Sequence, residues 1–252
     1  MPTYRDQGIV LKTRPVRDAD RTYTIYTANH GKITVLAQGT RRGKSKLSPH
    51  LSSFGVVEIM VAKGRRIDRL AGACLARRFS SLPDSLPKTI TAQSFLLTVD
   101  SLTKRELPEE RIFELLVDFF EALDRWSAPE FVRGGHHPVY DGAALKLLDI
   151  LGFAPEFDAC VRCRGKLSVS GNALNALRGG IECSTCRPYS KETVSSGVIE
   201  ALRLMRRSHL TSLQQADVPA EVASPTSELI EALLVGHLEE GIRALRFMRQ
   251  LA

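Results

Sequence analysis

The clearest guide to the fold is Thr22-Tyr-Thr-Ile-Tyr-Thr27, followed by the turn signal Asn29-His-Gly31 and by Lys32-Ile-Thr-Val-Leu-Ala-Gln38. In both long segments apolar side chains alternate with polar ones, so that one face carries Tyr23 and Ile25, and then Ile33, Val35 and Ala37. This period of two is typical of strands that bury one face. A glycine after Asn and His favours a turn with positive φ. The stretch therefore predicts two strands separated by a turn.

Three further segments extend this pattern. Gly8-Ile-Val-Leu-Lys12 is a short apolar run, Phe54 to Ala62 places Val57, Ile59 and Val61 on an inner face, and Lys63-Gly-Arg65 resembles a hairpin tip before a fifth strand, Arg66 to Leu75. Five short strands in about 75 residues suit a small barrel, and the OB-fold has five strands. An SH3-like barrel fits the same pattern.

After Phe79 the period changes from two to that of a helix. The linker-like Ser80 to Pro87 precedes predicted helices at Ile90–Leu102, from Pro108 onward, Ala143–Leu151, Val198–Arg207, Thr226–Leu238 and Gly241–Leu251. We therefore expect an α+β multidomain chain. Its parts are an OB-fold-like β-barrel at 1–80 that binds nucleic acid, an α-helical domain at 81–154 and 191–252, and a cysteine-bearing insertion at 155–190.

Composition and charge narrow the class of protein. Of 252 residues, 43% are hydrophobic and 25% charged, which is typical of globular proteins. There is no apolar run of about 18 residues and no signal-peptide pattern among the first twenty, so we expect a cytoplasmic protein. Residues 1–80 hold sixteen Lys and Arg against five acids, whereas residues 81–252 hold nineteen against twenty-three. This asymmetry favours a polyanion-binding first domain over a merely solvated basic surface.

The cysteines form two pairs in the insertion. Cys160-Val-Arg-Cys163 and Cys183-Ser-Thr-Cys186 have the C-x2-C spacing of a zinc ribbon. Four thiolates close a tetrahedron around one ion and leave no position for an activated water, so the expected cofactor is one structural Zn²⁺. Redox dithiols or unrelated cysteines are the alternative. The fifth cysteine, Cys74, lies in an apolar segment and is expected to be buried.

Enzyme chemistry finds little support. A zinc deaminase needs H-x-E beside its cysteines, and neither His136 nor His137 is followed by x-Glu. These two histidines are expected in a surface turn between helices. Gly43-Lys44-Ser45 matches the end of the nucleotide-binding phosphate-loop motif G-x4-G-K-[ST], but Gln38 occupies the position of the first glycine of that motif. We expect no catalytic residue and no enzyme activity.

The loops of the predicted barrel are basic. Cations in such loops neutralise phosphates and release counterions, which gives affinity without sequence preference. The candidate DNA-binding residues are Arg14, Arg17, Arg41, Arg42, Lys44, Lys46, Arg65 and Arg66. Bases could stack on Tyr4, Tyr23, Tyr26, Phe54 or Phe79. Most of these rings are expected to fill the core instead, so charge should dominate binding.

The order of these segments resembles the RecO family of bacterial DNA repair proteins. The resemblance lies in Tyr4-Arg-Asp-Gln-Gly-Ile-Val-Leu11, Asp20-Arg-Thr-Tyr-Thr-Ile-Tyr26, Gly31-Lys-Ile-Thr-Val-Leu-Ala-Gln-Gly39 with its basic loop, and Leu145 to Phe153 leading into Cys160 and Cys163.

The resemblance implies a role as a recombination mediator of the RecF pathway in DNA damage repair. It implies binding of single- and double-stranded DNA, annealing of complementary strands, and work with RecR to load RecA onto DNA coated by single-stranded-DNA-binding protein. It also implies a place at the nucleoid. A zinc-stabilised RNA- or ribosome-associated binding protein is the alternative.

Overall fold

The structure, a computed structural model, describes residues 2–16, 18–51, 54–127, 137–188, 192–216 and 218–236. Its packing divides the chain into two compact units, Met1–Arg125 and Trp126–Ala252. The expected domain limits near residues 80, 154 and 191 stay predictions. Within the described ranges, no helix combines the length and apolarity needed to cross a membrane.

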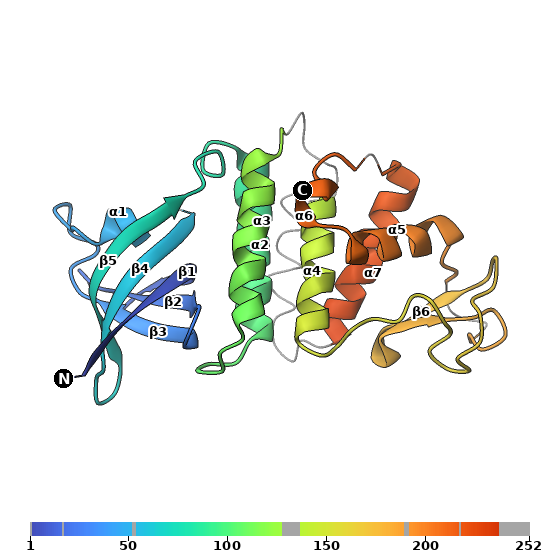
Figure 1. The fold of residues 1–252 in the computed structure, drawn as a ribbon, viewed down its shortest axis with the longest axis horizontal. Coiled ribbons are helices and arrows are strands. Elements are labelled where there is room, and N and C mark those ends of the chain that lie inside the picture. Colours follow the sequence, from blue (N-terminus) through green and yellow to red (C-terminus); the bar gives the residue numbers. More distant parts are fainter. Residues whose placement is uncertain are drawn as a thin grey trace. The chain divides into compact units, whose positions relative to one another are not determined.

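The first unit begins with five strands, as the sequence predicts (Figure 1). These are β1 (Thr3–Pro15), β2 (Arg21–Thr27), β3 (Gly31–Ala37), β4 (Gly55–Ala62) and β5 (Asp68–Arg78). They hydrogen-bond in the order β1-β2-β3-β5-β4 and form a closed barrel, because β4 pairs back with β1. All pairs are antiparallel except β3 with β5.

Closure depends on β1, which is much longer than the predicted Gly8–Lys12. Its first half pairs with β4 from Thr3 to Gly8, and its second half pairs with β2 from Gly8 to Pro15. Gly8 therefore lies where the strand changes partners. A Cβ at this position would come within 2.5 Å of the Ile25 Cγ2 atom, so the close approach requires glycine.

The inner faces predicted from alternation are confirmed. The buried core of the barrel includes Tyr23, Ile25, Ile33, Val35, Ala37, Val57, Ile59 and Val61. Each large apolar side chain among them contributes roughly 1.5–3 kcal/mol through its burial.

Two helices, α2 (Leu86–Leu102) and α3 (Glu110–Arg125), complete the first unit, which also contains the short α1 (Ser48–Leu51). The helix α2 begins at Leu86, before the predicted Ile90, because Pro87 is tolerated in a first helical turn. Asp100 of α2 joins two strands, since its carboxylate lies 3.2 Å from Lys12 Nζ and 3.4 Å from Lys32 Nζ. From the barrel side, the Tyr26 hydroxyl donates to the Glu109 carbonyl at 3.2 Å.

The second unit is helical with one insertion. Its helices are α4 (Pro138–Ile150), α5 (Ser196–Arg207), α6 (Leu210–Leu213) and α7 (Ala220–Gly236), and the insertion carries the two-stranded sheet of β6 (Ala173–Asn175) and β7 (Gly180–Glu182). The predicted helix at 241–251 and His136 lie outside the described residues.

Two expectations about single residues were wrong. Cys74 is exposed, because side chains alternate along β5 and that of Cys74 points away from the interior of the barrel. His137 is buried and caps α4, with its Nδ1 accepting from the Val139 N–H at 3.1 Å, and its ring lies 4.0 Å from that of Trp126. Burial lowers the pKa of His137 to about 4.

A buried carboxyl links two helices of the second unit. Asp141 of α4 is almost fully buried, and the Ser227 hydroxyl of α7 lies 2.6 Å from its Oδ2. Burial raises the pKa of Asp141 to about 7 from its ordinary 3.8. The folded state therefore keeps a proton that the unfolded state has lost above about pH 4, so this group makes stability fall as pH rises from about 4 to about 7.

We expect Asp141→Asn to remove this decrease in stability between about pH 4 and about pH 7. The variant should match the parent below about pH 4 and exceed its free energy of unfolding by roughly 2–4 kcal/mol at about pH 8. Urea unfolding followed by fluorescence of Trp126, the only tryptophan of the chain, measures this. The contribution of His137 is common to both proteins and cancels. Glu200→Gln, an exposed change on α5, is the control; equal stabilities of parent and Asp141→Asn at pH 8 would contradict the prediction.

Candidate metal centre and nucleic-acid interface

Each cysteine pair lies in a tight turn of the insertion. In the first turn the Arg164 N–H donates to the Cys160 carbonyl at 2.9 Å, and Arg164 takes a positive φ of 62°. The second turn follows β7 directly, and there the Cys186 N–H donates to the Cys183 carbonyl at 3.0 Å. The Val161 N–H donates to the Ile181 carbonyl at 2.9 Å, which holds the two turns together.

The four sulfur atoms converge as the spacing predicts. All four ligand atoms lie within 4.8 Å of one another, and Cys163 Sγ is 3.9 Å from Cys183 Sγ. A tetrahedron with zinc–sulfur bonds of about 2.3 Å has sulfur–sulfur edges of about 3.8 Å. The donor set and its dimensions therefore fit a thiolate-bound metal ion. Cys160 and Cys183 are buried, whereas Cys163 is exposed at the edge of the cluster.

Hydrogen bonds already favour a thiolate at one position. Burial acts to raise the pKa of Cys160, but hydrogen bonds from the backbone N–H groups of Cys163, Cys183 and Arg162 and from the Cys163 thiol together outweigh it and lower this pKa to about 6. Bonds with the thiols of Cys163 and Cys183 raise the pKa of Cys186 to about 12. A metal ion that binds all four sulfurs must displace the protons that they share without it.

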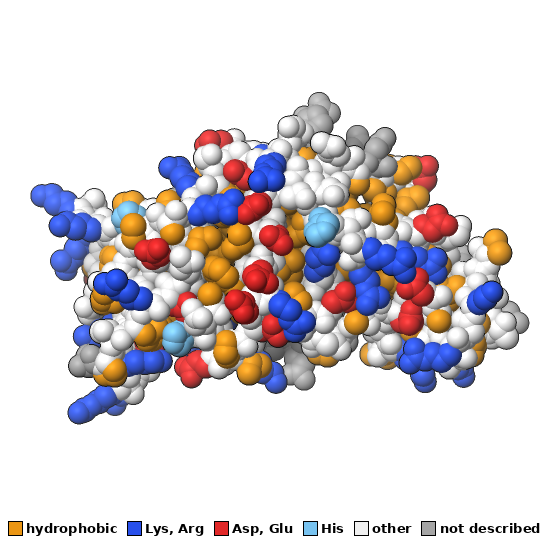
Figure 2. Space-filling model, viewed as in Figure 1, with side chains coloured by type: hydrophobic (Ala, Val, Ile, Leu, Met, Phe, Trp, Pro, Cys, Tyr) orange, Lys and Arg blue, Asp and Glu red, His pale blue; other side chains and the backbone are white. Residues whose placement is uncertain are grey.

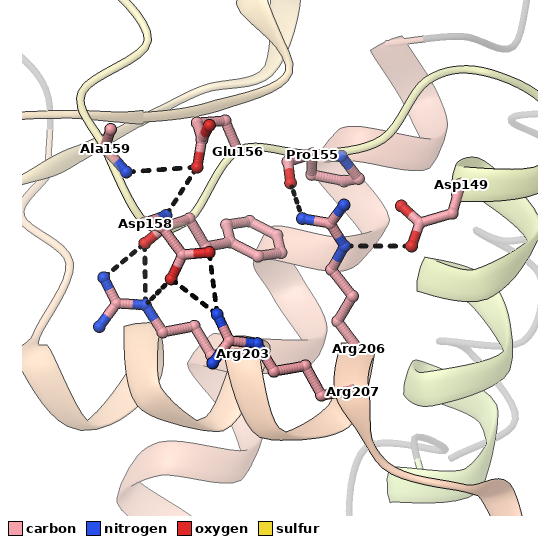
Figure 3. A network of polar contacts seen from close by, with 9 residues as sticks. Asp149, Pro155, Glu156, Asp158, Ala159, Arg203, Arg206 and Arg207 are labelled. Atoms are coloured by element: carbon pink, nitrogen blue, oxygen red, sulfur yellow. Dashed lines mark hydrogen bonds and ion pairs between the residues drawn. The ribbon is translucent and has the colours of Figure 1, made fainter. Parts of the chain in front are cut away.

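An arginine network ties the insertion to the helices of the second unit (Figure 3). Arg203 and Arg207 of α5 both pair with Asp158, at 3.1 and 3.0 Å. Arg206 pairs with Asp149 at the end of α4, at 3.0 Å, and donates to the Pro155 carbonyl at 2.7 Å. This network was not among the features predicted from the sequence. Its signal is the 203-206-207 spacing, which places three arginines on one side of a helix.

Two of the basic loops of the barrel emerge at the same end of β3. Ala37, the last residue of β3, pairs with Arg21 at the start of β2, and Leu36 pairs with Arg69 near the start of β5. The β1–β2 loop and the loop after β3 therefore leave the barrel as neighbours. The β4–β5 turn does not join them, because β5 runs parallel to β3 and the turn lies toward the start of β3, where the Lys63 N–H donates to the Pro2 carbonyl. The Arg41 N–H also donates to the Ala19 carbonyl at 3.0 Å, which joins the first two loops.

The described DNA-binding candidates lie in or beside these loops and are all exposed: Arg14, Arg41, Arg42, Lys44, Lys46, Arg65 and Arg66. Arg17 lies outside the described residues. Figure 2 shows Lys and Arg side chains gathered along the barrel, on the left. Within the described parts of the chain, no salt bridge engages Arg42, Lys44 or Lys46, in contrast to Lys63, which pairs with Asp68 at 3.0 Å. The charges of the three former residues are therefore available to a ligand.

The aromatic candidates divide as expected between core and surface. Tyr23, Tyr26 and Phe79 are buried, and Phe79 packs edge-on against Phe120 of α3 at 5.3 Å. Tyr4 and Phe54 are only partly buried. Few rings therefore remain for stacking on bases.

Comparison with known proteins assigns the family. The family model "Recombination protein O N terminal" matches residues 1–79, and "Recombination protein O C terminal" matches residues 83–246. The chain belongs to the RecO family. It is 30% identical to the DNA repair protein RecO of Frankia casuarinae over 257 residues, which cover 99% of this chain and 100% of the relative. It is 31% identical to RecO of a Nocardioides species over 253 residues, with 98% and 99% covered. The resemblance inferred from sequence motifs is thus confirmed.

The cysteine cluster depends on a glycine of β7. A Cβ at Gly180 would collide with the Glu156 carbonyl oxygen and come within 2.6 Å of Val161 Cγ1. We expect Gly180→Ala to push the two turns apart and to weaken cobalt binding, followed by thiolate absorption, by roughly tenfold or more. Gly165→Ala is the control, since its Cβ would meet only Cys163 Sγ at 3.4 Å. Equal cobalt affinities of the two variants would show that the packing at Gly180 does not position the sulfurs.

Proposed function

We propose that this chain is a DNA repair and recombination mediator. It binds single- and double-stranded DNA, anneals complementary strands and, with RecR, helps to load RecA onto DNA coated by single-stranded-DNA-binding protein. The observation that carries this proposal is the convergence of two basic loops, the β1–β2 loop and the loop after β3, at one end of a closed barrel. Membership of the RecO family, whose relatives are named DNA repair proteins, supports it. Its place of action would be the cytoplasm, at the nucleoid.

The barrel is proposed to be an OB-fold-like nucleic-acid-binding module. Its strand order and its single parallel pair, β3 with β5, support this proposal. In OB-folds, the β1–β2 and β4–β5 loops border the binding surface. Exposed arginines lie at the end of β1 just before the first loop (Arg14) and within the second loop (Arg65 and Arg66).

Strand annealing follows from the kind of contact that these loops offer. Two DNA strands repel each other through their phosphates, and the cationic side chains of the loops screen this repulsion without recognising the base sequence. Because the described rings of the barrel are mostly buried, stacking should add little, and contacts led by charge exchange readily. The protein would act without nucleotide hydrolysis and not as an enzyme.

The four cysteines are proposed to hold one structural Zn²⁺, supported by their spacing and by the dimensions of the cluster. Cys160, Cys163, Cys183 and Cys186 would fill the coordination sphere. The ion would supply folding energy to the insertion, whose sheet has only three residues in each strand.

Removing loop charge should weaken binding of every sequence alike. If roughly five phosphates of a single strand are neutralised, log affinity falls with log salt at a slope near −3.5. We expect Arg41→Gln with Arg42→Gln to make this slope shallower by about 1.4. Arg111→Gln with Arg125→Gln removes the same charge from α3 of the same unit and should leave the slope unchanged. Fluorescence anisotropy measures both; an unchanged slope in the loop variant would place the DNA site elsewhere.

Metal analysis of protein purified without chelator should find about one zinc per chain. In Cys163→Ser, the zinc should be lost, and hydrogen exchange should show lost protection in the insertion while β2 and β3 stay protected. Cys74→Ser, outside the cluster, is the matched control. An insertion that stays ordered without metal would contradict the structural role.

Annealing separates the mediator from its alternative. We expect the chain to accelerate pairing of complementary strands coated with single-stranded-DNA-binding protein, at low salt and equally with or without ATP. A quenched-fluorophore assay follows the rate, and a parallel titration with RNA of the same sequence tests the other class. No acceleration, together with tighter RNA binding, would favour the RNA- or ribosome-associated protein.

A further inference from the structure

One of the four clustered cysteines differs from the others in its access to solvent. Cys160 and Cys183 are buried, and Cys186 is partly buried. Cys163 is exposed. Gly165 lies beside its sulfur, since a Cβ at that glycine would meet the Cys163 Sγ atom at 3.4 Å. Because Gly165 has no side chain, it leaves the Cys163 sulfur open to small molecules in solution.

The Cys163 sulfur also has a neighbour with which it can form a bond. Cys183 Sγ lies 3.9 Å from Cys163 Sγ, on the other of the two turns. The sulfurs of a disulfide are about 2.05 Å apart, so a shift of about 2 Å by the exposed side chain of Cys163 brings them together. The buried Cys160 sulfur is instead held by the Cys183 N–H, which donates to it at 3.3 Å. The geometry therefore favours Cys163 and Cys183 as the pair that can be cross-linked.

The surroundings of Cys163 suit a reactive cysteine. Arg162 and Arg164, on either side of it in the sequence, are exposed cations. Arg162 donates to the Cys186 carbonyl at 2.9 Å, and Arg164 lies 3.9 Å from a carboxylate oxygen of Glu156. Exposed, electropositive surroundings are typical of the cysteines that oxidants attack.

We propose that Cys163 is a site of reversible oxidation by peroxides, with Cys183 as the thiol that completes a disulfide. The proposal rests on the metal site of the proposed function and adds a means of regulating that site. The disulfide takes two of the four thiolates out of the coordination sphere. Cys160 and Cys186 remain, and two ligands are too few for a structural zinc site, which needs four. The insertion therefore holds its metal ion only under reducing conditions.

The reaction proceeds in two balanced steps. The Cys163 thiolate attacks one oxygen of the peroxide, the O–O bond breaks, and hydroxide leaves, which gives a sulfenic acid on Cys163. The Cys183 thiolate then attacks the Cys163 sulfur, so that the S–S bond forms, the S–O bond breaks, and a second hydroxide leaves. Two thiolates thus give two electrons to one molecule of hydrogen peroxide, and both hydroxides take up protons from solvent.

The disulfide joins the same two turns as the metal ion. The insertion therefore keeps one cross-link between the turns when it loses the ion, and a thiol reductant restores all four ligands. Peroxides also damage DNA, so this change occurs under the conditions in which a repair protein is needed.

Two variants that keep four metal ligands test the role of Cys163. Cys163→His removes the proposed site, whereas the matched Cys186→His changes the other cysteine of the cluster that is not buried. Histidine replaces one cysteine in zinc sites of the Cys3His type. Both changes are made in full-length Cys74→Ser protein, which lacks the exposed thiol outside the cluster and serves as the parent. Hydrogen peroxide is added to the zinc-loaded proteins, and a chromophoric chelator follows the release of zinc. We expect release at least about tenfold slower from Cys163→His than from the parent, and within about threefold of the parent from Cys186→His.

Disulfide mapping by mass spectrometry gives a second measurement, which needs no histidine variant and so decides the proposal even if histidine fails to hold the metal. In the parent, peroxide should link Cys163 to Cys183, and dithiothreitol with added zinc should restore about one zinc per chain. Equally fast release from both variants, or a disulfide between other cysteines, would overturn the role of Cys163 and leave the zinc site intact. A parent protein that carries no zinc before oxidation would instead overturn the metal site of the proposed function.

Discussion

The pairing of β1 with two different strands is the constraint on which the first unit depends. One long strand closes the barrel against β4 with its first half and supports β2 with its second half, and the change of partner occurs at Gly8. The closed sheet buries its aliphatic face inside the barrel. Beyond Gly8, β1 no longer pairs with β4, and a cavity of about 710 Å³ lies there beside α2.

Charge is arranged on this barrel in two ways. Where β1 and β3 meet α2, cations are neutralised, since Lys12 and Lys32 share Asp100. Partial burial lowers the pKa of Lys32, and the nearby Asp100 carboxylate counters this effect. In the loop that follows β3, Arg42, Lys44 and Lys46 are exposed instead. The lysines that pair with Asp100 of α2 are thus separated from the exposed loop cations that could contact a polyanion.

The second unit is stabilised in a different way, because its insertion is too small to form a hydrophobic core of its own. Paired cysteines supply one set of restraints, and the arginines of α5 supply another through Asp158 and the Pro155 carbonyl. These ionic contacts lie at the surface or partly buried, so each contributes modestly; Arg203 and Arg207 act together on one carboxylate. The insertion is therefore fastened to the helices as well as held together from within.

The sequence alone determined the local periods and the cysteine spacing. Alternation in Thr22–Thr27 and Lys32–Gln38 predicts strands because side-chain direction reverses at every residue, and C-x2-C spacing predicts a shared ligand site because it is a local geometry. Only the tertiary structure decided which strands pair, that Cys74 faces outward, that His137 is buried beneath a ring, and that Arg203, Arg206 and Arg207 meet acids from other segments. These features arise from contacts between residues far apart in the chain, whose partners no local pattern specifies.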